Sequence, residues 1–218
     1  MNELGKQVNI LSELQGRTPD QQEVIRYFTR VKKGCFGKLL SDQEYEAKVM
    51  KRARSTDFKQ KALSIMGLDE EQVKEIEPVH FEGYEISEQT NHVRYGEDKK
   101  WRSSSYQISW LFFSSTQVYL YQYTFNLDND ATSEISDEYF YKDITNFSSG
   151  TSVVEKTVWE SKGCMSLKPP LPSRKQVSTN TVRIVVPGEK LSASMEQSSY
   201  TDNAIKGMRA KLREKKES

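Results

Sequence analysis

Only two cysteines and two histidines occur among the 218 residues of this chain. Cys35 and Cys164 lie far apart in the sequence, and His80 and His92 are the only histidines that could join them. Structural zinc sites take four ligands from closely spaced cysteines and histidines, and this sequence lacks that spacing. We therefore expect free thiols, with no metal site and no disulfide bond.

Long apolar runs are missing too. No segment approaches the roughly 20 consecutive apolar residues that cross a bilayer as a helix. Residues 1–16 include acidic side chains and have no continuous apolar core, so they do not resemble a signal peptide. We expect a cytoplasmic protein whose thiols stay reduced.

A strong net charge is also absent, because 32 basic residues face 31 acidic ones. This balance gives no global attraction to nucleic acid or to an anionic membrane. Charge is nevertheless segregated, with a net +7 over residues 26–61 and a net −7 over residues 69–88. Two interpretations stay open: solvated helical faces that partly neutralise each other, or a basic surface for phosphates or an acidic partner.

The motifs of familiar enzymes are missing as well. The chain has no glycine-rich phosphate loop and no G-x-S-x-G nucleophile elbow. A hydrolytic triad needs a histidine, but His80 is expected to be structural and His92 to be solvated. Residues 128–130 lack the glycine and glutamate of a calcium loop and predict a turn. We expect no enzymatic activity and no cofactor.

Helices are predicted throughout residues 1–77. Capping boxes at 18–21 and 41–44 place Thr or Ser three residues before Gln or Glu, and Gly34 and Gly67 are expected to end helices. Such short helices need tertiary packing to persist in water. Five helices are predicted, beginning near residues 4, 18, 41, 56 and 69.

From residue 79 the pattern changes to alternating apolar positions. Residues 105–147 hold more than half of the aromatic side chains, and Ser, Asn and Asp clusters divide them into runs. Period-two alternation with such breaks is typical of an antiparallel meander. The proline-rich segment 166–178 is expected to be an exposed loop, and a helix is predicted from residue 201. Strands are predicted near 79–86, 93–95, 104–114, 117–127, 139–144, 153–159 and 181–186.

About seven strands followed by one amphipathic helix resemble the pleckstrin-homology-like (PH-like) fold. Residues 139–144, with Phe147 three positions later, resemble the Tyr-x-x-Ile strand motif of bacterial members and of the related GRAM domains. Residues 204–212 are similar to the terminal helix of these proteins. The resemblance covers roughly residues 79–214.

The resemblance implies an α+β chain with two parts. Residues 1–77 would form a helical N-terminal extension. Residues 78–218 would form an antiparallel PH-like barrel, or a strongly bent sheet, of about seven strands with a C-terminal helix. A second likeness lies in residues 37–48, which resemble the short helical SHOCT module of bacterial proteins.

These features favour a non-enzymatic interaction module that binds a protein partner or an anionic membrane lipid. Lys99, Lys100 and Arg102 follow the Gly96 turn and are the candidate ligand-binding residues. The resemblance implies this role, because such loops supply cations to phosphates in lipid-binding members of the fold. Exposed tyrosines and short helices also make self-association an expected property.

Two alternatives remain. The basic helices could bind nucleic acid, since 57–66 and 70–76 loosely suggest a helix-turn-helix, although acidic residues in 70–76 oppose phosphate approach. An enzyme with an unrecognised site is the other alternative. Its mark would be a cleft that holds buried, converging ionisable groups.

Overall fold

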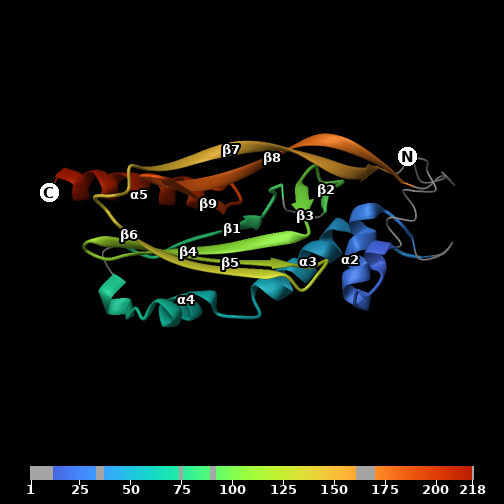
Figure 1. The fold of residues 1–218 in the computed structure, drawn as a ribbon, viewed down its shortest axis with the longest axis horizontal. Helices are drawn as coiled ribbons and strands as arrows, with labels where there is room; N and C mark the ends of the chain where they lie inside the picture. Colours follow the sequence, from blue (N-terminus) through green and yellow to red (C-terminus); the bar gives the residue numbers. More distant parts are fainter. Residues whose placement is uncertain (1–11, 33–36, 74–75, 89–91, 161–169, 218) are drawn as a thin grey trace.

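The computed structural model describes residues 12–32, 37–73, 76–88, 92–160 and 170–217. Cys35, Cys164 and the helix predicted near residue 4 lie outside these residues. Figure 1 shows three layers, with helices on one side, a four-stranded sheet in the middle and a second sheet with the C-terminal helix on the other side.

The predicted capping boxes form the N-terminal helices. Thr18 caps α2 (Pro19–Thr29) and Ser41 caps α3 (Asp42–Ala53), each through a reciprocal bond with the residue three positions on. Helix α2 ends earlier than predicted, at Arg30, whose left-handed conformation (φ 60°) closes the last turn. Gly34 lies outside the described residues.

The next two elements differ slightly from the prediction. Asp57, one residue later than expected, caps α4 (Phe58–Met66) by accepting a hydrogen bond from the Gln60 backbone amide. Gly67 ends this helix in a left-handed conformation, as predicted. A four-residue 3-10 helix, η1 (Glu70–Val73), follows, which is too short for a recognition helix. No described helix combines the length and apolar character needed to cross a membrane.

The middle layer is the predicted aromatic meander. Its antiparallel strands run in the order β1 (Val79–Tyr84), β4 (Ser105–Phe113), β5 (Gln117–Asn126) and β6 (Thr132–Phe140). A short hairpin of β2 (Val93–Tyr95) and β3 (Trp101–Ser103) is inserted between β1 and β4.

The second sheet contains β7 (Asn146–Glu160), β8 (Leu171–Val186) and β9 (Glu189–Ser194), and α5 (Ser199–Glu217) follows it. The segment expected as a proline-rich loop is strand from Leu171 onward, so that prediction was wrong there. Pro172 is opposite Trp159 in β7, where β8 has no second neighbour. An edge tolerates proline because only one side forms ladder hydrogen bonds.

Within the described residues no sheet closes into a barrel, so the predicted barrel is not observed. The strand predicted over residues 139–144 is present only at its first two residues. Strand β6 ends at Phe140, and a turn follows in which the Tyr141 amide donates to the Thr116 carbonyl at 3.1 Å. Tyr141 and Ile144 place their side chains in the core instead of continuing the strand.

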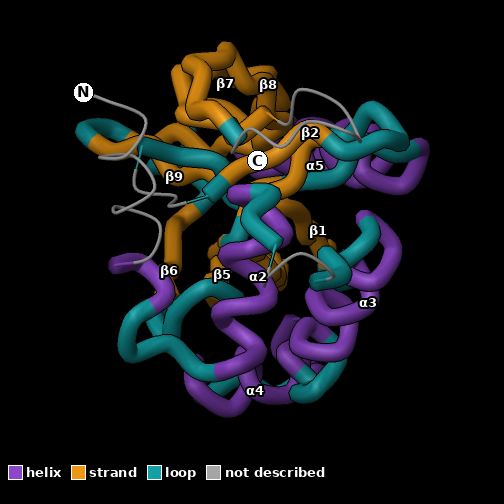
Figure 2. Tube along the Cα trace, turned by 90° about the vertical axis from the view of Figure 1, so that its right-hand side faces the viewer, coloured by secondary structure: helices purple, strands orange, loops and turns teal. Residues whose placement is uncertain are grey.

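Three apolar clusters occur among the described residues, and the smallest packs the β2–β3 hairpin against β7 and β8. The two larger clusters join the layers. One lies between the two sheets and α5, and includes Phe81, Phe147 and Met208. The other lies between the first sheet and the helices, and includes Phe28 and Tyr121. The helical region therefore shares a core with the sheet, and Figure 2 shows α3 and α4 on the face of that sheet away from β7 and β8.

Candidate functional site

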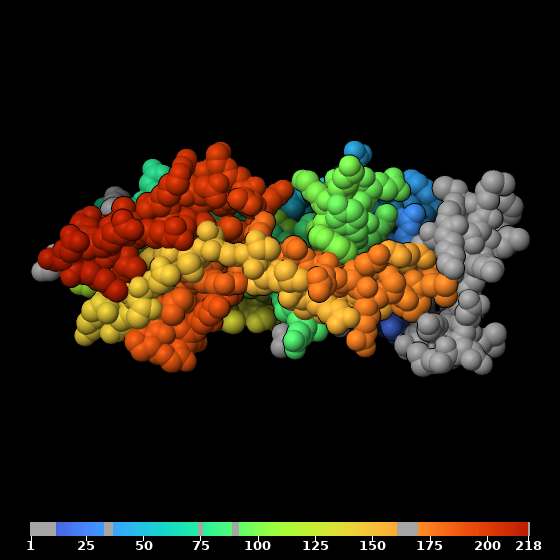
Figure 3. Space-filling model, turned by 90° about the horizontal axis from the view of Figure 1, so that it is seen from above, coloured from blue at the N-terminus to red at the C-terminus, as the bar shows by residue number. Residues whose placement is uncertain are grey.

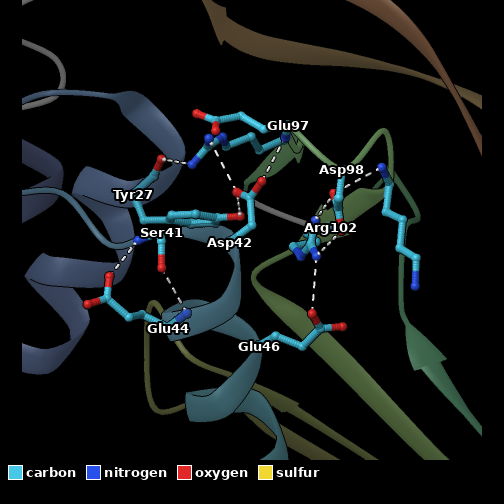
Figure 4. Close-up of polar contacts among 10 residues, drawn as sticks. Tyr27, Ser41, Asp42, Glu44, Glu46, Glu97, Asp98 and Arg102 are labelled. Carbon is cyan, nitrogen blue, oxygen red and sulfur yellow. Dashed lines mark hydrogen bonds and ion pairs between the residues drawn. The ribbon is translucent and has the colours of Figure 1, made fainter.

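A charged pocket of about 650 Å³ lies between the end of α2, the beginning of α3 and the β2–β3 hairpin. Figure 4 shows its polar contacts, which join elements that are far apart in the sequence. Its charged lining comprises five cations and four acids, namely Arg30, Lys32, Lys38, Arg94, Arg102, Asp42, Glu46, Glu97 and Asp98.

Asp42 is the central carboxylate of this charged pocket. The Ser41 cap places it in the first turn of α3, where a carboxylate is favourable beside the helix N-terminus. It accepts hydrogen bonds from the Tyr27 hydroxyl at 2.8 Å and the Glu97 amide at 2.7 Å. It also pairs with the Arg94 guanidinium at 3.3 Å. Asp42 thereby ties α2, α3 and the hairpin together.

Aromatic rings form the floor beneath this carboxylate. The Arg94 guanidinium lies 4.4 Å from the centre of the Tyr27 ring, which stacks on Tyr45 with 4.5 Å between ring centres. The Tyr45 hydroxyl donates to the Ser103 carbonyl at 2.6 Å. Burial raises the pKa of both phenols well above their ordinary value, so they remain neutral donors.

Arg102, a predicted site residue, turns inward to this pocket. Its side chain is only 1% exposed and donates to both Asp98 oxygens, at 2.8 and 2.6 Å, and to Glu46 at 3.2 Å. The hydrogen bonds from Arg102 lower the pKa of Asp98 to about 2. Gly96 permits this close arrangement, because a Cβ there would lie 2.5 Å from an Asp98 oxygen.

Lys99 and Lys100 do not join Arg102 in the charged pocket. Both are exposed at the turn of the hairpin, and Lys99 has a left-handed backbone (φ 63°). The Lys100 ammonium lies 3.4 Å from Glu196. The structure thus separates the three predicted residues into two exposed lysines and one buried arginine.

Arg30, like Arg94, lines the pocket but was not among the candidate site residues of the sequence. Within the residues that the structure describes, its half-buried guanidinium forms no hydrogen bond and no ion pair. Burial and the positive charge of Arg94 lower its pKa. The carboxylates of Asp42 and Asp98 are already bound to other cations. Arg30 is therefore a partly desolvated charge beside Arg94, and the negative charges of Glu97 and Asp42 offset only part of this effect on its pKa.

The segregated charges found in the sequence are partly neutralised in the structure. Arg54 in the basic segment donates to Glu82 in the acidic segment at 2.7 Å, and Lys59 pairs with Glu70 at 2.9 Å. Arg30 makes no such pair with a described residue. The structure thus confirms the partial neutralisation for these pairs, and a basic surface for phosphates or an acidic partner stays a prediction.

His92 was expected to be solvated, and that expectation is wrong. Its ring is 11% exposed, lies 2.7 Å from Asp128 through Nδ1 and 3.2 Å from Glu13 through Nε2, and stacks on Phe28. Burial alone would lower the pKa of His92. The hydrogen bonds to Asp128 and Glu13 outweigh burial and raise this pKa to about 9.

This cluster predicts a loss of stability at alkaline pH. A histidine whose pKa is 6.5 when unfolded and about 9 when folded stabilises fully below pH 6.5, and the contribution disappears as the pH rises through 9. The free energy of unfolding should fall by about 3 kcal/mol over this window. Urea unfolding measures it, and a His92→Gln variant should show no such fall. An equal fall in the variant would refute the assignment to His92.

The charged pocket is suited to binding more than to proton transfer. A general base is most effective when its pKa lies near the working pH, whereas Asp98 is held ionised by Arg102. The described residues contain no group of His, Cys, Asp and Glu side chains arranged to hold a metal. No family model, no curated protein and no solved structure matches this chain.

Proposed function

We propose that this chain is a non-enzymatic binding module whose charged pocket accepts an acidic side chain of a protein partner. The observation that carries the proposal is the unpaired Arg30 guanidinium beside Arg94 in a pocket of about 650 Å³. An incoming carboxylate would lie between two guanidinium groups and relieve their repulsion. Arginine binds carboxylates through two parallel hydrogen bonds, which gives both affinity and orientation.

A PH-like arrangement is part of this proposal. It is supported by a four-stranded meander, a three-stranded meander and one C-terminal helix in that order, with the β2–β3 hairpin as an insertion. The helical region adds the α2 and α3 walls of the pocket. We place the protein in the cytoplasm, in keeping with its two cysteines and the reducing conditions there.

A protein partner fits this pocket better than a membrane does. Four carboxylates line the pocket with the cations, so the site has little long-range attraction for a flat anionic surface. A single acidic side chain could instead enter the pocket and meet Arg30 at short range. Lys99 and Lys100 lie outside the pocket, and the alternative function is that these two exposed lysines bind an anionic membrane.

Calorimetric titration with a short oligoglutamate peptide tests the proposal. Arg30→Ala should weaken binding about tenfold or more, since a charge-assisted hydrogen bond contributes roughly 1.5–3 kcal/mol. Arg52→Ala is the matched control, because Arg52 is an exposed arginine on α3 with no ion pair to a described residue. Arg52→Ala should leave the affinity unchanged.

Two outcomes contradict the proposal. Equal weakening by Arg30→Ala and Arg52→Ala would mean that the peptide responds only to overall charge. The second outcome combines two results: the peptide does not bind, and the protein sediments with phosphatidylglycerol vesicles unless Lys99 and Lys100 are both replaced by Glu. That result would assign the function to the hairpin and a membrane.

A further inference from the structure

A second pocket, of about 370 Å³, lies at the opposite end of the molecule. It is bounded by the last turns of α5 and by Thr145 and Asn146 at the beginning of β7. We call it the basic pocket, because the charged residues that line it within the described part of the chain are Arg209, Arg213 and Lys216. Figure 3 shows α5 exposed beside the first residues of β7, far from the β2–β3 hairpin.

The sequence of α5 places the three cations together. Residues 209, 213 and 216 have i, i+4, i+7 spacing, which puts them on one helical face over roughly 10 Å of the axis. Leu212 lies among them and is buried in the core between the two sheets. The cations therefore lie beside the apolar face that fixes α5 to the protein.

Arg209 is held in place before any ligand arrives. Its Nε donates to the Phe147 carbonyl at 2.7 Å, and the residue is half-buried. This bond uses one of the five guanidinium donors and fixes the plane of the group. The remaining donors can bind an anion, and little side-chain entropy is lost because the guanidinium group is already ordered.

Among the residues that the structure describes, no carboxylate lines the basic pocket. Two acids adjoin the cations in sequence: Glu214 binds Lys211 at 2.8 Å, and Glu217 is exposed and does not line the pocket. Arg213 and Lys216 form no ion pair with any residue that the structure describes. Cations near a helix C-terminus do complement the helix dipole, but this effect is confined to the last turn. It accounts for Lys216 but does not reach Arg209, two turns earlier, whose bond to Phe147 leaves its other donors available.

We propose that the basic pocket binds a phosphate group. Two guanidinium groups and one ammonium match the charge and the several oxygens of a phosphate, and the Asn146 amide can add a neutral donor. This site is independent of the charged pocket, which mixes five cations with four acids and lies at the other end of the chain. Free phosphate compounds and lipid head groups share the chemistry that the basic pocket would recognise.

Calorimetry of the full chain with inorganic pyrophosphate is the first arm of the test. An Arg213→Ala, Lys216→Ala double variant should bind at least about tenfold more weakly. Both side chains are exposed, so the variant should fold. A Lys190→Ala, Lys206→Ala double variant removes the same charge from exposed positions outside the pocket and should bind normally. Arg30→Ala should also bind normally.

Sedimentation with phosphatidylglycerol vesicles is the second arm, and it identifies the source of the phosphate. Vesicle binding that only the Arg213, Lys216 double variant loses would support the site with a lipid head group as its ligand. Binding of neither pyrophosphate nor vesicles would overturn the proposal. Equal weakening in both double variants would overturn it as well, because binding would then depend on net charge alone.

Discussion

Replacing Asp42 with alanine is expected to lower the free energy of unfolding by about 3 kcal/mol, as breaking a buried ion pair typically does. The Asp42 side chain is 12% exposed and its partner Arg94 is 7% exposed. The substitution leaves the Arg94 guanidinium buried without its carboxylate. It also removes the acceptor for the Tyr27 hydroxyl and the Glu97 amide. Denaturant unfolding of both proteins measures the difference.

Asp42→Asn is the matched control, because it keeps the shape and the carbonyl acceptor while removing the charge. It should lose less stability than Asp42→Ala. If Asp42→Ala changed stability by less than about 0.5 kcal/mol, as an exposed surface substitution does, Asp42 would not join the helices to the hairpin.

Phe147→Ala is expected to lower the free energy of unfolding by about 3–5 kcal/mol, the usual range for a fully buried phenylalanine. Phe147 is completely buried between the two sheets and α5. Its removal leaves a cavity in the apolar cluster that also contains Met208 and Ile205, and the strands and the helix can fill this cavity only in part. The measurement is again denaturant unfolding, followed by both far-ultraviolet and tyrosine signals.

Phe140→Ala is the control for this substitution, since Phe140 is 48% exposed at the end of β6. It should change stability by less than about 0.5 kcal/mol. Similar small losses in both variants would show that the second sheet does not pack on the first. Coincident unfolding by the two signals would show that the layers unfold as one unit.

Local signals in the sequence predicted the local parts of the fold. The capping boxes at Thr18 and Ser41 formed where expected, since each depends only on residues within one helical turn. The aromatic strands β4 and β5 also formed within a residue or two of the predicted bounds. Period-two alternation reports a strand directly, because successive side chains face opposite sides of a sheet.

Properties that depend on distant neighbours were not predictable. Whether two sheets close into a barrel is decided by the pairing of strands far apart in sequence. Pro172 enters a strand because β8 is unpaired on one side there, which no local pattern indicates. His92 is buried because Asp128 and Glu13 approach it from other elements.

The candidate site also depends on contacts between distant parts of the sequence, so it was only partly predictable. Lys99, Lys100 and Arg102 are close in sequence, yet the two lysines lie in the exposed turn before β3, whereas Arg102 lies in β3 with its side chain buried against Asp98. Arg30 lies in the basic segment that the sequence marked, but only the fold places it beside Arg94. Arg94 itself gives no sequence signal, because its partners Asp42 and Tyr27 come from the helical region.

The most direct test of the charged pocket is nuclear magnetic resonance of arginine side chains during titration with the oligoglutamate peptide. The Nε–H signals of Arg30 and Arg94 should shift together and saturate, while that of Arg52 stays fixed. Each signal can be assigned from the corresponding arginine variant. Shifts spread over exposed arginines, with Arg30 unmoved, would contradict the proposal that this pocket binds an acidic side chain.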